Sequence, residues 1–161
     1  MALLLPLNKV LIVEPEPKAA LYFLDWFKDE WKQVDVACCA RDAVEIIHRN
    51  GNGYDFIYLD LNLPDAVGEA AVKIIMAASN KPIVAETGDI KLIEKLEGEG
   101  ITLGVYGVVR EGSWMRHHIA QTITASIARW QIARMNLLMD EKEKSLAEEK
   151  AKWRRDYLSK T

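Results

Sequence analysis

Four polar residues stand directly after short apolar runs, where they could carry out chemistry together. Glu14 follows VLIV, Asp60 follows FIYL, Thr87 follows PIVAE and Arg110 follows GVYGVV. In an open parallel sheet, ligands bind at the carboxyl ends of the strands, so these side chains should meet there. Carboxylates at such an edge could hold a metal ion. Pro15 stands where a further carboxylate would be useful as a ligand.

Strand-like and helix-like segments alternate along the chain and could position these residues. Short apolar runs bounded by Gly or Pro predict strands, and the stretches between them have helical periodicity. The expected strands are 10–13, 33–40, 54–61, 81–88 and 103–110. The expected helices are 17–31, 41–50, 65–79 and 89–100, and a fifth that begins near residue 114.

The strands are apolar without alternation, which indicates a parallel sheet that is buried on both faces by helices. We therefore predict an α/β fold, a doubly wound five-stranded parallel sheet in the order 2-1-3-4-5, with an extended C-terminal helix. In the first helix, we expect one buried stripe made of Leu21, Leu24, Phe27 and Trp31. Two adjacent cysteines, residues 38–39, are expected in the half-buried second strand, without a disulfide framework.

Composition restricts the function classes. The chain has 161 residues and a formal net charge of −3, which gives no electrostatic footprint for nucleic acid. No apolar stretch approaches the roughly 20 residues that a membrane-spanning helix needs. The apolar run near the N-terminus is too short for a signal peptide. We expect a cytoplasmic protein that binds neither nucleic acid nor membrane.

The fifth helix should continue into a charged extension, because no Gly or Pro interrupts it up to the last residue. We place a first domain at 8–133 and the extension at 134–161. Apolar residues recur every seven positions from the end of the first domain into the extension, at Ile132, Met139, Leu146 and Trp153. The companion heptad positions are charged, so this seam is thin. It predicts a weak coiled coil in a parallel homodimer, with a single exposed helix as the alternative.

The motifs VLIVEPEP, DFIYLDLNLPDAVG, PIVAETG and GVVR resemble, in order and spacing, the receiver domain of two-component response regulators, the CheY-like fold. The resemblance covers residues 8 to 133. It implies that Asp60 takes a phosphoryl group from a histidine kinase or a phosphotransfer protein. It also implies that Thr87 hydrogen-bonds the phosphoryl oxygens, that Gly88 leaves room for them, and that Arg110 takes the place of a lysine that pairs with the phosphoryl group.

The resemblance also implies a Mg²⁺ site made of Glu14, Asp60 and the backbone carbonyl of Asn62. A carboxylate that attacks a phosphodianion meets like-charge repulsion, which a divalent cation offsets. The family's second acid is Pro15 here, which removes a direct ligand, so we expect weak Mg²⁺ binding. Glu111 replaces the proline that usually follows the lysine and brings a negative charge near the site.

The family's switch aromatic, three residues before the lysine, is Gly107 here, so a Thr–aromatic switch should be impaired. The resulting hypothesis is a receiver domain in phosphorelay signalling that is not an enzyme and has at most weak autophosphatase activity. The alternative is a pseudo-receiver that is not phosphorylated and acts as an interaction or dimerisation module. A phosphatase of the haloacid dehalogenase type is disfavoured, because its D-x-D motif requires a second Asp at the position that Asn62 occupies.

Overall fold

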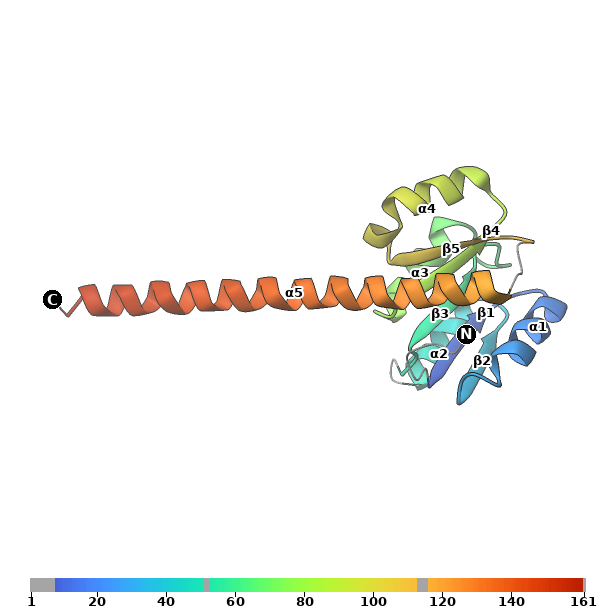
Figure 1. Ribbon diagram of the computed structural model, residues 1–161, viewed down its shortest axis with the longest axis horizontal. Coiled ribbons are helices and arrows are strands. Elements are labelled where there is room, and N and C mark those ends of the chain that lie inside the picture. The colour runs from blue at the N-terminus through green and yellow to red at the C-terminus, as the bar shows by residue number, and fades with distance from the viewer. Residues whose placement is uncertain (1–7, 51–52, 113–115, 161) are drawn as a thin grey trace. The chain divides into compact units, whose positions relative to one another are not determined.

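The computed structural model describes residues 8–50, 53–112 and 116–160, and it contains one five-stranded parallel sheet (Figure 1). The strand order is β2-β1-β3-β4-β5, as predicted. The strands are β1 (Lys9–Val13), β2 (Gln33–Ala37), β3 (Phe56–Asp60), β4 (Ile83–Thr87) and β5 (Val105–Arg110). The helices are α1 (Pro17–Phe27), α2 (Ala40–Arg49), α3 (Glu69–Ala78), α4 (Ile90–Leu103) and α5 (Arg116–Leu158).

Helices cover both faces of the sheet, which is why the central strands β1 and β3 can be buried along most of their length. One core cluster joins α2, α3 and α4 to the sheet and consists mainly of aliphatic residues. The other joins α1 and the first turns of α5 to the opposite face and is rich in aromatic residues. The rings of Phe23, Phe27, Trp31, Phe56 and Tyr58 contact one another there.

The buried face of α1 differs from the predicted stripe. Phe27 and Trp31 are buried as predicted, but Leu21 is 64% exposed, and the helix buries Ala19, Phe23 and Trp26 instead. Apolar residues occupy most positions of this helix, so periodicity does not single out one face. The large aromatic rings bury more apolar area than leucine, and they take the side that faces the sheet.

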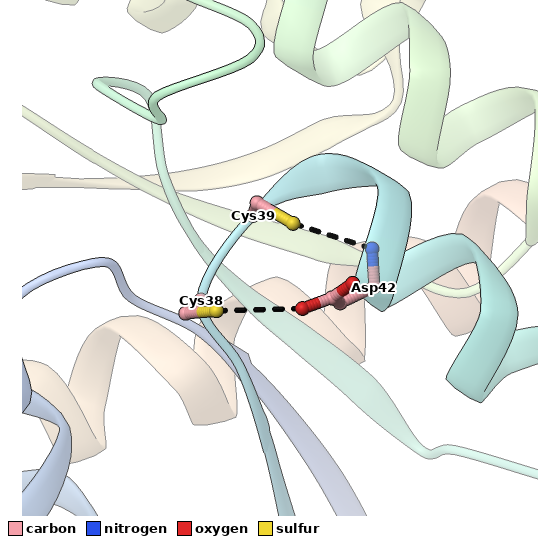
Figure 2. Close-up of side chains that lie close together, drawn as sticks. All are labelled: Cys38, Cys39 and Asp42. Carbon is pink, nitrogen blue, oxygen red and sulfur yellow. Dashed lines mark hydrogen bonds between the residues drawn. The ribbon is translucent and has the colours of Figure 1, made fainter.

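The predicted second strand is too long, because β2 ends at Ala37 and the two cysteines lie outside it. Cys38 is exposed and donates from its Sγ to the carboxylate of Asp42 at 3.4 Å (Figure 2). Cys39 is the N-cap of α2, and its Sγ accepts a hydrogen bond from the Asp42 backbone N–H. The carboxylate of Asp65 accepts hydrogen bonds from the backbone N–H groups of Ala40 and Arg41 at the start of this helix. The chain therefore turns into a capped helix where strand pairing was expected.

The ends of α3 and α4 also differ from the prediction. α3 begins at Glu69, after Gly68 as its N-cap, and not at residue 65. α4 continues through Gly98 and Gly100 and ends at Leu103, and its C-cap is Gly104, which has a φ of 87°. Gly100 lies against β5, where a Cβ atom would be 2.8 Å from the Val105 carbonyl oxygen. Close packing explains this glycine inside a helix.

α5 runs without a break from Arg116, as its sequence predicts, while the expected start near residue 114 lies outside the described residues. Contacts divide the chain into two compact units, Met1–Ala128 and Arg129–Thr161. The predicted boundary was at 133/134. Across the described ranges, no helix is long and apolar enough to cross a bilayer.

Candidate functional site

Three carboxylates from three adjacent strands meet at the carboxyl edge of the sheet. They belong to Glu14, which follows β1, to Asp60 at the end of β3, and to Glu86 in β4. One oxygen of each lies within 4.8 Å of the oxygens of the other two. Glu14 is 3% exposed and Glu86 is 1% exposed, whereas Asp60 is half-buried. We call these three residues the carboxylate cluster.

Strand pairing explains why the three side chains meet. Val13 pairs with Leu59, and Asp60 pairs with Glu86, so the cluster residues lie side by side across the sheet. Side chains two residues apart on a strand point to the same face. The residues two positions before the cluster, Ile12, Tyr58 and Val84, all belong to the core under α1 and α5. The carboxylates therefore emerge on that face.

Hydrogen bonds hold each carboxylate, but one oxygen has no partner. Glu14 Oε1 accepts from the Glu16 backbone N–H at 3.0 Å, whereas the buried Glu14 Oε2 has no hydrogen-bond partner. Asp60 Oδ1 accepts from the Asn62 backbone N–H at 2.7 Å. Glu86 Oε2 accepts from the hydroxyl of Tyr58 at 2.6 Å. An unpaired polar atom of this burial is uncommon and calls for a ligand or a proton.

Burial raises the pKa of Glu14 from 4.5 to about 8, and the charges of Asp60 and Glu86 add to this shift. The Glu16 N–H bond opposes the shift but does not cancel it. Burial next to Glu86 also raises the pKa of Tyr58 well above 10. The phenol therefore stays protonated and remains a donor to Glu86 at neutral pH.

A pocket of about 290 Å³ opens over the cluster. Its walls carry five acidic side chains and, among the described residues, no basic one: Glu14, Glu16, Asp60, Glu86 and Glu111, with Pro15, Ala19 and Asn62. Glu16 caps α1 by accepting from the Lys18 N–H. The five acidic side chains give the pocket a strongly negative potential, which attracts cations.

The other predicted site residues lie beside this pocket or outside it. Thr87 is buried and lines a neighbouring pocket of about 220 Å³ with Gly88, and Asn62 and Glu111 line both pockets. Thr87 Oγ1 accepts from the Asp89 N–H at 3.1 Å. Arg110 pairs with Thr87 along the strands, but it is exposed and lines neither pocket.

No protein-family model and no curated protein matches the sequence. Several solved structures are similar to this chain in fold. The adenylate cyclase from Rhodopirellula baltica has a TM-score of 0.68 at 17% identity, covering 84% of this chain and 99% of that chain. The receiver domain of the Francisella response regulator 1452 has a TM-score of 0.62 at 22% identity, and the similarity covers 76% of this chain and 98% of that chain.

A third similar structure is the receiver domain of the sensor histidine kinase PA1611 from Pseudomonas aeruginosa, with a TM-score of 0.59 at 21% identity over 75% of this chain and 98% of that chain. It holds a magnesium ion in its active-site cleft. The strand order of this chain and its structural similarity to receiver domains over most of its length decide the architecture. The chain has the CheY-like receiver fold.

Within this receiver fold, Glu86 is the site residue that the sequence analysis missed. The fourth strand was interpreted as apolar up to Thr87, although PIVAETG contains one acid. An acidic residue inside an otherwise buried strand was the available signal, since buried carboxylates need partners. Its donor, Tyr58, is 28 residues away, so no local pattern pointed to the pair.

The receiver fold implies a divalent metal, and the donor set of this pocket fits one. Mg²⁺ and similar hard cations bind carboxylate and carbonyl oxygens. The cluster offers three carboxylates, and the orphaned Glu14 Oε2 is a buried acceptor that a cation would satisfy. Glu14, Asp60 and Asn62, the predicted metal ligands, all line this pocket.

Proposed function

We propose that the protein is a receiver domain of a two-component phosphorelay and that Asp60 is its phosphoacceptor. The observation that carries the proposal is the half-buried carboxylate of Asp60, held by the Asn62 N–H inside a pocket that fits a divalent cation. The donor would be a histidine kinase or a phosphotransfer protein, and we place the protein in the cytoplasm. The receiver fold supports this proposal.

In the proposed reaction, an oxygen of Asp60 attacks the phosphorus of a phosphohistidine. The new O–P bond forms as the P–N bond breaks, and the imidazole leaves with the bonding electron pair and takes up a proton. A carboxylate and a phosphodianion repel each other, and four further acids line the same pocket. Mg²⁺ held by Glu14, Asp60 and Asn62 would supply the positive charge that offsets this repulsion.

Thr87 and Arg110 have secondary roles in this proposal. The Thr87 hydroxyl can donate to a phosphoryl oxygen while it accepts from the Asp89 N–H, because a hydroxyl has one proton and two lone pairs. Arg110 would have to move its exposed guanidinium toward the pocket to pair with the phosphoryl group. We expect at most weak autophosphatase activity and no enzymatic turnover of a separate substrate.

Intact mass spectrometry after incubation with acetyl phosphate and Mg²⁺ tests the proposal. Wild-type protein should gain the mass of one phosphoryl group, and Asp60→Asn should gain none, because an amide is a poor nucleophile. A second control omits Mg²⁺ and adds EDTA. Equal modification of the Asp60→Asn variant would show that phosphorylation occurs elsewhere.

The second candidate is a pseudo-receiver that acts as an interaction module. It is favoured by the five acids that line the pocket and by the lack of a basic side chain there among the described residues, which together disfavour a phosphodianion. A wild-type protein that stays unmodified, under conditions that phosphorylate an ordinary receiver, would support this candidate. The fold is the same in both cases.

For either candidate, we propose that the extension of α5 pairs with the same segment of a second copy. Four exposed apolar residues repeat there every seven positions: Ile132, Met139, Leu146 and Trp153. Helices that are isolated and mostly charged gain little stability by themselves, so a partner helix would stabilise this segment.

A further inference from the structure

We infer that Glu86 is a metal ligand and that it completes, with Glu14 and Asp60, a three-carboxylate site for a hard divalent cation. In this arrangement, Glu86 supplies from β4 the negative charge that Pro15 cannot supply after β1. The inference deepens the proposed function, because it concerns the same pocket and rests on its use of a metal.

Position is the first argument. Asp60 and Glu86 are paired residues on adjacent strands, and an oxygen of Glu86 lies within 4.8 Å of oxygens of both Asp60 and Glu14. Oxygens within this limit can contact one Ca²⁺ at about 2.4 Å, and a small inward movement of the side chains would let them contact Mg²⁺ at about 2.1 Å. Glu86 also lines the pocket, so its carboxylate faces the cavity in which the cation would lie.

A buried oxygen without a hydrogen-bond partner also supports the inference, and this oxygen belongs to Glu14. Glu14 is only 3% exposed, yet its Oε2 has no hydrogen-bond partner. Five acidic side chains line the pocket, and no basic side chain among the described residues does. The unpaired Oε2 is therefore a buried oxygen that a bound cation could contact.

Tyr58 is the third argument, because it fixes the orientation of Glu86. Its hydroxyl donates to Glu86 Oε2 from the strand next to β4, at 2.6 Å. Metal-bound carboxylates are commonly held by such hydrogen bonds from outside the coordination shell. Tyr58 is therefore a positioning residue, and Glu86 is held rigidly at the floor of the pocket.

The donor set also indicates the class of cation. Mg²⁺ usually binds through one or two protein carboxylates and keeps several waters, whereas Ca²⁺ takes six to eight oxygens in flexible geometry. Three carboxylates exceed what Mg²⁺ usually takes. We expect the pocket to accept Mn²⁺ and Ca²⁺ as well as Mg²⁺.

Mn²⁺ binding to the full chain, followed by electron paramagnetic resonance in the absence of any phosphoryl donor, tests the inference. Glu86→Gln keeps the size of the side chain and an oxygen that accepts from Tyr58, so circular dichroism should show an unchanged fold. We expect its Mn²⁺ affinity to fall at least about tenfold, because one carboxylate next to the ion is lost. Glu111→Gln is the matched control; this exposed acid lines the pocket outside the cluster and should change affinity by less than about twofold.

A rescue experiment tests whether a carboxylate at position 15 can replace the carboxylate of Glu86 as a metal ligand. Pro15→Asp, added to Glu86→Gln, should recover most of the lost affinity, since it restores three carboxylates by a different route. An unchanged affinity of Glu86→Gln, alongside a loss in Asp60→Asn, would overturn the role of Glu86. Wild-type protein that binds no Mn²⁺ at about 10 mM would also overturn it, because a three-carboxylate site should bind more tightly.

These outcomes are separable from those of the proposed function. If Glu86→Gln binds Mn²⁺ as wild type does and Asp60 is still modified by acetyl phosphate, the inference fails and the proposed function stands. If Glu86→Gln loses affinity and wild-type Asp60 is never modified, the metal site stands and the phosphoacceptor role fails.

Discussion

The hydroxyl of Tyr58 donates a 2.6 Å hydrogen bond to the carboxylate of Glu86, and both residues are almost completely buried. They lie on adjacent strands, at the point where the aromatic core under α1 meets the acidic pocket. The pair therefore connects the stability of the core to the geometry of the candidate site. Substitutions at either residue should affect both.

Tyr58→Phe should destabilise the protein by about 1–3 kcal/mol, because Glu86 then keeps its burial but loses a donor. Urea unfolding followed by circular dichroism measures the free energy of unfolding. Tyr157→Phe is the control, since Tyr157 is 58% exposed and should change stability very little. Equal stability of Tyr58→Phe and wild type would show that the bond contributes nothing.

Gly107→Ala should cost about 1–3 kcal/mol of stability, because a Cβ atom at this position would lie 2.1 Å from Ser126 Oγ on α5. Ser126 is fully buried and its hydroxyl donates to the Thr122 carbonyl, so it cannot move away easily. Thermal unfolding of the variant measures the loss.

The matched control is Gly98→Ala, on the exposed side of α4, where no atom lies within 4 Å of the added Cβ. Alanine is the better helix former, so this variant should gain about 0.5–1 kcal/mol. A gain in both variants would mean that α5 does not pack closely on Gly107.

Glu14→Gln should change the pH dependence of stability in metal-free buffer. Glu14 has a pKa of 4.5 in the unfolded chain and about 8 in the folded protein. Because the pKa is higher in the folded protein, the contribution of Glu14 to stability is fully present below about pH 4.5. It is lost as the pH rises through about 8, because the unfolded chain releases the proton at lower pH than the folded protein does. The amide does not titrate, so the variant should lose less stability than wild type over this range.

Urea midpoints at about pH 5 and about pH 8.5, with EDTA present, give the comparison. Glu16→Gln serves as the control, since Glu16 is exposed and no cluster oxygen belongs to it. Parallel pH profiles for Glu14→Gln and wild type would contradict the assignment of the raised pKa to Glu14.

Met139→Lys should weaken self-association if the apolar repeat of the extension is a dimer seam. Met139 is 58% exposed and shares its heptad position with Ile132 and Leu146. Sedimentation equilibrium at about 100 µM would detect a dimer whose association free energy exceeds roughly 5 kcal/mol in magnitude.

Leu137→Lys is the control, because Leu137 is equally exposed at 58% but lies on a different face of the helix. It should leave the dimer intact. If wild type and both variants are monomers at this concentration, the seam does not join two copies and the dimer proposal is wrong.

The sequence by itself determined the order and type of the elements. Five continuous apolar runs separated by helical stretches indicated a parallel sheet, and the observed strand order confirms it. It also placed Glu14 and Asp60 at one edge of the sheet, because the carboxyl ends of parallel strands share an edge, and both residues line one pocket. These features follow from local patterns and from the few topologies that such patterns permit.

Tertiary structure decided which side of an element faces inward and which distant groups meet. In α1, where most positions are apolar, burial depended on which rings fit against the sheet. Gly100 looked like a helix end but lies inside α4, because β5 approaches its backbone closely. Arg110 ends its strand as expected, yet its exposed side chain lies outside both pockets.

Glu86 marks the limit of the sequence most clearly. An acid inside an apolar strand is tolerated when a hydrogen-bond donor, a cation or a proton stabilises its carboxyl group. The donor, Tyr58, comes from another strand, and the cluster forms only when β1, β3 and β4 are in register. Burial and charge at this site are properties of the assembled sheet, because strand register fixes the distances between these carboxylates and no single strand contains them.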